Sequence, residues 1–173
     1  MDAYQCKPEI LSAVRGKEIN RGSPQAQLVM TMIDAWMADD HEHLEALLNR
    51  VGSDFGEVFW ILNVMVGGMI NAIAIHTSQS FEDTLQIVFQ QLARITETDE
   101  VAALARETIT AWSSGDDALV EEINFDSEIQ RLGPEMVLIH FLAMLSSISR
   151  SFAKQTGNSI EDIRTGWANA LGA

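Results

Sequence analysis

Cysteine is nearly absent from this sequence of 173 residues, in which Cys6 is the single one. One cysteine cannot form an internal disulfide, and this is typical of proteins in a reducing compartment. The first ten residues, MDAYQCKPEI, lack a basic stretch followed by an apolar core, so we expect no signal peptide. Together these absences predict a cytoplasmic protein.

Basic residues are also scarce, with 11 Lys and Arg against 25 Asp and Glu and a formal net charge of -14. Between Ile95 and Glu128 the chain has ten acidic residues, and Arg106 is its only basic one. Nucleic-acid backbones and anionic membranes are bound through clustered Lys and Arg, so the composition argues against both. An acidic surface instead suits solubility or a basic protein partner.

Only three prolines and eleven glycines interrupt the chain, so long regular elements are expected. A hydrophobic fraction of 47% with 21% charged residues is typical of a globular protein. The length suits a single domain with a substantial core. Apolar residues recur at helical spacing, as in Leu28, Met32 and Ala35, which predicts an all-α fold.

Residues 58–75 form a stretch of eighteen residues without a charged side chain. This length is the short limit for a membrane-spanning helix. Asn63, Asn71 and a glycine pair dilute its hydrophobicity, and few cations flank it. We interpret the stretch as the buried central helix of a soluble protein, with a membrane span as the alternative.

Two short segments resemble each other, HTSQSFEDTL at 76–85 and QTGNSIEDIR at 155–164. An offset of 79 residues places Thr77, Ser80, Glu82, Asp83 and Leu92 on Thr156, Ser159, Glu161, Asp162 and Leu171. An offset of 76 places Ala26, Leu28, Ile33, Ala35, Trp36, Asp40 and Glu45 on Ala102, Leu104, Ile109, Ala111, Trp112, Asp116 and Glu121. We interpret this as a tandem duplication of a unit of about 75–80 residues, with chance similarity as the alternative.

The duplication predicts a helical bundle of about eight helices, formed by two four-helix units that share one core in a single domain. Residues 1–22 would form an N-terminal extension, 23–96 the first repeat and 97–173 the second. In the first repeat, Ser23, Asp40 and Ser80 are expected to cap helices, because each precedes an apolar helical pattern.

The third helix of each unit is expected to be long and apolar, over Phe55–His76 and Pro134–Thr156. The second unit should also contain helices over Val101–Trp112 and from Asp116 to about Phe125, and a last helix capped by Ser159. A helix that is apolar on nearly all faces must be surrounded, so we expect the two long helices to pack against each other. The small pairs at 67–68 and 146–147 would then lie near their crossing, although a homodimer could supply the same cover.

The segment DDHEH at 39–43 holds five potential metal ligands. On a helix only residues three or four apart share a face, so Asp39 and His43 can converge while His41 and His43 cannot. Zinc and iron sites need three or four convergent ligands. We therefore interpret the segment as a solvated helix start and expect no metal and no cofactor, with Asp39 and His43 kept as weak metal candidates.

Trp60, His140 and Met144 are candidates for an apolar pocket between the two long helices. Ordinary core packing is the alternative for the tryptophan and methionine, and a neutral core histidine with one hydrogen bond is the alternative for His140.

Residues 152–163, FAKQTGNSIEDI, have the spacing of a helix-turn-helix. The helix that would read DNA begins with Glu161 and Asp162, and Arg164 is its only cation. These charges oppose binding to phosphates, so a plain helical corner is the preferred interpretation of this segment.

No glycine-rich phosphate loop, cysteine pair or nucleophile elbow occurs in the sequence. The leading hypothesis is a non-enzymatic protein-interaction or regulatory module, and its partner would be a protein, basic or a second copy of the chain. The alternatives are a helical bundle that binds a small apolar ligand, and a DNA-binding regulator that acts through residues 152–171.

Overall fold

The computed structural model describes residues 21–92, 99–114 and 127–173, and all regular secondary structure in these ranges is helical. The elements in chain order are α2 (Pro24–Met37), α3 (His41–Val51), the short 3-10 helix η1 (Gly52–Asp54), α4 (Phe55–Thr77), α5 (Phe81–Leu92), α6 (Asp99–Ser114), α8 (Ser127–Leu132), α9 (Pro134–Thr156) and α10 (Ile160–Leu171). The all-α class is therefore confirmed. Most of the predicted N-terminal extension and the helix expected from Asp116 to Phe125 lie outside the described residues.

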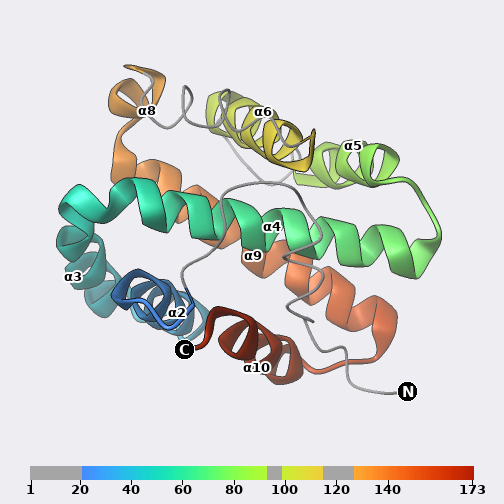
Figure 1. Cartoon of the computed structure of the whole chain (residues 1–173), viewed down its shortest axis with the longest axis horizontal. Coiled ribbons are helices and arrows are strands. Elements are labelled where there is room, and N and C mark those ends of the chain that lie inside the picture. The colour runs from blue at the N-terminus through green and yellow to red at the C-terminus, as the bar shows by residue number, and fades with distance from the viewer. Residues whose placement is uncertain (1–20, 93–98, 115–126) are drawn as a thin grey trace.

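The two longest helices, α4 and α9, lie side by side at the centre of the molecule (Figure 1). On one side α2 packs against α3, α4 and α10, and α10 also packs against α9. On the other side α5 and α6 pack against α4 and against each other, and α8 packs against α9. The predicted pairing of the two long helices is confirmed, and the shorter helices cover this pair from both sides.

The central position of α4 follows from its sequence, because a helix that is apolar on nearly every face must be enclosed. Two helical stretches, 41–77 and 134–156, are long and apolar enough to cross a bilayer by length and composition. A buried core helix has the same length and composition. In the first stretch 89% of the most apolar eighteen residues are buried within the protein, and in the second 50% are buried.

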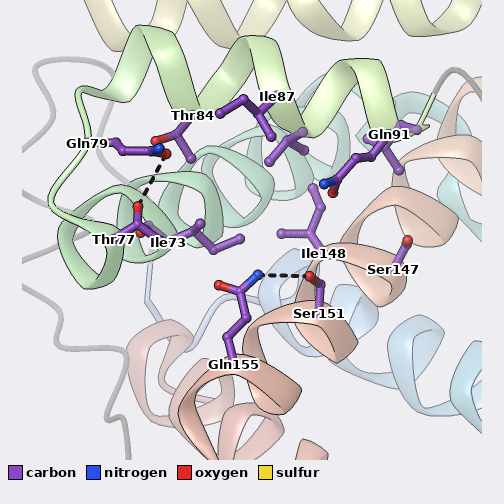
Figure 2. Close-up of a pocket in the computed structure, with 12 residues that line it drawn as sticks. Ile73, Thr77, Gln79, Thr84, Ile87, Gln91, Ser147, Ile148, Ser151 and Gln155 are labelled. Carbon is purple, nitrogen blue, oxygen red and sulfur yellow. Dashed lines mark hydrogen bonds between the residues drawn. The ribbon is translucent and has the colours of Figure 1, made fainter.

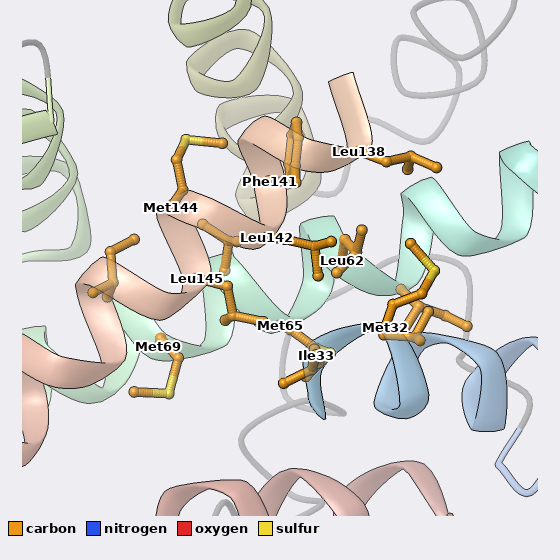
Figure 3. Close-up of a cluster of buried hydrophobic side chains, with 14 of the residues drawn as sticks. Met32, Ile33, Leu62, Met65, Met69, Leu138, Phe141, Leu142, Met144 and Leu145 are labelled. Atoms are coloured by element: carbon orange, nitrogen blue, oxygen red, sulfur yellow. The ribbon is translucent and has the colours of Figure 1, made fainter. Parts of the chain in front are cut away.

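Aromatic contacts show that α4 and α9 run in the same direction. Near their beginnings, the ring of Phe59 meets that of Phe141 edge to face, with centroids 5.1 Å apart. Near their ends, the rings of His76 and Phe152 lie 6.3 Å apart. A cluster of leucine and methionine side chains from both helices and from α2 fills the space between (Figure 3). Each such side chain stabilises the fold by about 1.5–3 kcal/mol when it is fully buried.

The predicted helix starts are confirmed by hydrogen bonds at their caps. The Ser23 hydroxyl accepts a hydrogen bond from a backbone N–H of the first turn of α2 at 3.1 Å. The side-chain oxygens of Asp40 and Ser80 likewise accept hydrogen bonds from backbone N–H groups in the first turns of α3 and α5, with donor–acceptor distances of 3.1 Å. At α10, Ser159 and Asp162 form a reciprocal capping box. These short polar side chains satisfy backbone donors that a helix leaves unpaired at its start.

The structure differs from the sequence prediction at three places. The helix expected over 101–112 is longer, since α6 covers Asp99–Ser114, and the short helices α8 and η1 had not been predicted. Ser146 lines a small void together with Trp36 and Trp167, so it lies where α9 meets α2 and α10. Ser147 lines a groove beside α5. Ser146 therefore lies beside α2 and α10 and Ser147 lies beside the groove, while the expected place of the pair near the crossing with α4 stays a prediction.

The ends of α4 and α9 share one backbone geometry with different residues. Ser78 follows α4 with a φ of 54°, and Gly157 follows α9 with a φ of 73°. This left-handed conformation costs a residue with a side chain roughly 1–2 kcal/mol, while glycine adopts it freely. Ser78 is therefore a strained helix end, whereas Gly157 is a relaxed one.

We predict that Ser78→Gly raises the free energy of unfolding by about 0.5–1 kcal/mol, because the relief of strain exceeds the added flexibility of the unfolded chain. Gly157→Ala should lower it by about 1 kcal/mol, because nothing within 4 Å obstructs the new methyl group and only the backbone strain remains. Urea unfolding followed by circular dichroism measures both. Ser78→Ala is the control, since it keeps the strain, and equal stability of the Gly and Ala variants would contradict the prediction.

Candidate functional site

In the part of the chain that the structure describes, a hollow lies between the last turns of α4, helix α5 and the second half of α9 (Figure 2). Its volume is about 230 Å³. The twelve lining residues are aliphatic or carry a hydroxyl or amide group: Ile73, Ile87, Val88, Leu92 and Ile148 on the one hand, Thr77, Gln79, Thr84, Gln91, Ser147, Ser151 and Gln155 on the other. We call this hollow the α5 groove.

The apolar part of the α5 groove forms its floor and one lip. Ile73 from α4 and Ile148 from α9 point into the space between the helices (Figure 2). Ile87 from α5 is 41% exposed, which is unusual for a large aliphatic side chain in the described part of this protein. Among the described residues, Ile75 and Met136 are large hydrophobic side chains with still greater exposure.

The polar part of the α5 groove is already hydrogen-bonded in a defined way. The Thr77 hydroxyl donates to the Ile73 carbonyl at 2.7 Å, and the Thr84 hydroxyl donates to a carbonyl of its own helix start at 2.8 Å. Gln155 donates through Nε2 to the Ser151 hydroxyl at 3.3 Å (Figure 2). The protons of both threonines are therefore engaged by backbone carbonyls, and Thr84 is only 1% exposed.

The charge of the α5 groove contrasts with that of the whole chain. The protein has a net charge of -14, yet none of the twelve lining residues is ionisable. Serine, threonine and glutamine side chains do not titrate near neutral pH, so the lining offers no general acid or base of its own. The groove can therefore bind uncharged groups through apolar contact and neutral hydrogen bonds.

A larger and more open hollow of about 530 Å³ lies between the end of α3 and the start of α9. Leu48, Val51, Phe55 and Leu138 form its apolar wall, and Glu135 lies at its edge. Because it is open, it would shield less of a bound group from water than the α5 groove does.

The predicted pocket residues lie apart from these hollows. Trp60 and Met144 are each 2% exposed and belong to the interior of α4 and α9. His140 is half-buried on α9, and its Nδ1 lies 2.8 Å from the carbonyl oxygen of Met136. None of the three lines the α5 groove, the hollow beside α3 or the small void at Trp167.

The weak metal candidates do not converge. Asp39 lies in the turn between α2 and α3 with a φ of 57°, and its carboxylate is 2.9 Å from Nε2 of His41. His43 uses its backbone N–H to cap the helix on Asp40. Across residues 21–92, 99–114 and 127–173, no three His, Cys, Asp or Glu side chains are grouped closely enough to hold a metal ion.

The segment with helix-turn-helix spacing forms the end of α9, the turn at Gly157 and α10. Arg164 donates two hydrogen bonds to the Asp34 carboxylate on α2, at 2.5 and 2.7 Å, and this contact raises the pKa of Arg164. Glu161 and Asp162 are exposed at the start of α10. The one cation of α10 is thus engaged in tertiary packing, while its exposed first turn is acidic.

Two buried polar atoms lack a hydrogen-bond partner among the described residues, Nε1 of Trp167 and Oδ1 of Asn63. Asn63 on α4 is 0% exposed, and its Nδ2 reaches the Phe59 carbonyl only at 3.4 Å. Its Oδ1 has no hydrogen-bond partner among the described residues. A buried polar atom without a partner destabilises a protein by about 1–3 kcal/mol.

We predict that Asn63→Leu raises the free energy of unfolding by about 1–2 kcal/mol, because it removes the unpaired oxygen and keeps the side-chain size. Chemical unfolding measures the change. Asn63→Ala is the matched control, since it removes the same polar group but leaves a cavity and should gain less or lose stability. A leucine variant less stable than the wild type would show that Asn63 has a partner that its described neighbours do not supply.

Comparison with known proteins gives no relative, because the chain matches no family model and no curated protein or solved structure is significantly similar to it.

Proposed function

We propose that the chain is a non-enzymatic protein-interaction module that recognises its partner through the α5 groove. The observation that carries this proposal is the composition of the groove: an apolar floor, a neutral hydrogen-bonding rim and the exposed Ile87 at the lip. Partly exposed apolar side chains surrounded by neutral polar groups are characteristic of contact surfaces between proteins.

The charge of the chain bears on the kind of partner. A net charge of -14 repels other acidic molecules at a distance, including a second copy of this chain. It attracts a protein that is basic around a neutral contact region. We therefore propose a different, basic protein as the partner, and a homodimer as the second choice.

Binding of a small apolar ligand is a second candidate function for the same groove. Pockets that hold drug-sized ligands usually measure about 300–1,000 Å³ and enclose most of the ligand surface. The α5 groove, at about 230 Å³, is smaller, and its lip residue Ile87 is 41% exposed. These dimensions favour a single side chain of a partner protein over a free ligand.

A DNA-binding role for residues 152–171 has less support. The phosphate backbone requires cations, yet Arg164 is paired with Asp34 and the exposed first turn of α10 carries Glu161 and Asp162. We do not favour this candidate.

We further propose that the fold arose by tandem duplication, with α4 equivalent to α9 and α5 to α10. In support, α4 and α9 each have 23 residues and end in left-handed residues. The last helix of each half also packs on the first helix of the other, α5 on α6 and α10 on α2. A crystal structure with a helix at 116–125 in the position equivalent to α3 would support the duplication, and its absence would count against it.

A photoreactive amino acid in place of Gln91, at the exposed rim of the α5 groove, tests the proposed function. We expect it to form one discrete protein adduct in a lysate of the source organism, because this position lies within reach of a bound partner. The same amino acid in place of Ile75, which is 63% exposed on α4 and does not line the groove, is the control. Mass spectrometry identifies the adduct, and a self-adduct indicates a homodimer.

The outcome that contradicts the proposal is the absence of any adduct specific to the Gln91 position. Adducts that form equally at both positions also count against it, because they would reflect random collision. Turnover of a metabolite by the purified chain would contradict the non-enzymatic part of the proposal.

A further inference from the structure

Helix α9 is apolar, yet it is covered far less completely than α4. Over its most apolar eighteen residues 50% are buried, whereas the value for the stretch that includes α4 is 89%. Six of its exposed or half-buried residues recur at intervals of four and three, so they form one stripe along the helix. They are Met136, His140, Ala143, Ser147, Arg150 and Lys154. We call this stripe the α9 face.

The charges on and beside the α9 face are distributed unevenly along the helix. Glu135 is exposed in the first turn, and Arg150 and Lys154 are exposed in the second half. Among the described residues, none of these three side chains has an ion-pair partner. An acid at one end and cations at the other make the face complementary to a reversed copy of itself.

The spacing of these charges fits two α9 helices that run in opposite directions. Arg150 follows Glu135 by fifteen residues, which corresponds to about 22 Å along an α-helix. A twofold axis beside Ala143, at the middle of this interval, brings Glu135 of each copy level with the partner's Arg150. Alanine at the crossing allows the helix axes to approach to about 8–10 Å. Antiparallel helices also place opposite ends of their dipoles side by side.

The local charges favour a second copy of this chain as the occupant of the α9 face. The net charge of -14 opposes self-association at a distance, but salt at physiological concentration screens exposed charges beyond about 8 Å. The groups at the contact therefore decide, and these pair an acid with a cation at both ends of the dimer. A membrane or a nucleic acid would need a cluster of cations, and this face carries two, Arg150 and Lys154.

We propose that the α9 face is a homodimer contact, in which α9 packs antiparallel against α9 of a second copy. Met136, which is 48% exposed, is then covered by the aliphatic stem of the partner's Arg150. This inference goes beyond the proposed function, because it adds a second contact surface to the α5 groove. Ser147 lies at the edge of both surfaces.

Sedimentation velocity of the full chain at a series of concentrations tests the contact, and we expect a dimer that dissociates on dilution. Ala143→Arg places two like charges at the twofold axis, so it should weaken the dimer about tenfold or more. Ile75→Arg, at an exposed position on α4 outside the α9 face, is the matched control and should dimerise like the wild type. Circular dichroism verifies the fold of both variants.

Reversal of the paired charges tests the register of the two helices. Glu135→Arg and Arg150→Glu should each weaken the dimer about fivefold, because each places like charges opposite one another. The two changes together should restore the wild-type affinity, since they exchange the partners of the same pair. Arg50→Glu, at an exposed position on α3, changes the net charge equally and should leave the affinity unchanged. These variants remain informative if Ala143→Arg does not fold.

The inference is overturned if the chain stays monomeric at every concentration, or if folded Ala143→Arg dimerises like the wild type. It is also overturned if the doubly reversed variant binds no more tightly than the single ones. Each of these outcomes leaves the proposed function standing, because the α5 groove is tested separately by the adduct at the Gln91 position.

Discussion

The burial of α4 is the constraint on which the rest of the structure depends. This helix has no charged residue over 58–75, and sixteen of its 23 residues are buried. A helix that is apolar on all sides cannot lie at a surface without exposing a large apolar area to water. Four other helices, α2, α5, α6 and α9, therefore pack directly against it. Their own apolar faces are turned inward by this requirement, and their polar faces form the surface.

The α5 groove results from the way α5 and α9 pack against the end of α4. Along the last turns of α4, α5 lies on one side and α9 on the other, so the space between them must be filled by side chains from all three helices. Where those side chains are isoleucine, valine, serine and glutamine, the filling is incomplete. Close packing is otherwise the rule in protein interiors, so this incomplete filling distinguishes the α5 groove from the core around it.

Sequence patterns predicted the parts of the fold that local physics determines. Serine and aspartate residues at cap positions predicted the starts of α2, α3, α5 and α10. The uncharged stretch over 58–75 predicted the central helix α4. The short helix α8 was missed because six residues carry too little periodicity to be recognised.

The candidate site could not be predicted in the same way. The groove residues on α4 and α9 are at least seventy positions apart in sequence, and their meeting depends on helix packing. Trp60, His140 and Met144 were chosen for their chemistry, yet two of them are core residues.

The parallel course of α4 and α9 affects the electrostatic potential at their carboxyl ends, beside the α5 groove. Each helix carries a partial negative charge at its carboxyl end, and parallel neighbours place these ends together. Thr77 and Gln155 of the groove lie in the last turns of α4 and α9, so both helix dipoles point their negative poles toward the same end of the molecule. His76 and Lys154 in these turns offset part of that potential. Electropositive groups are therefore favoured over anionic ones at this end of the molecule.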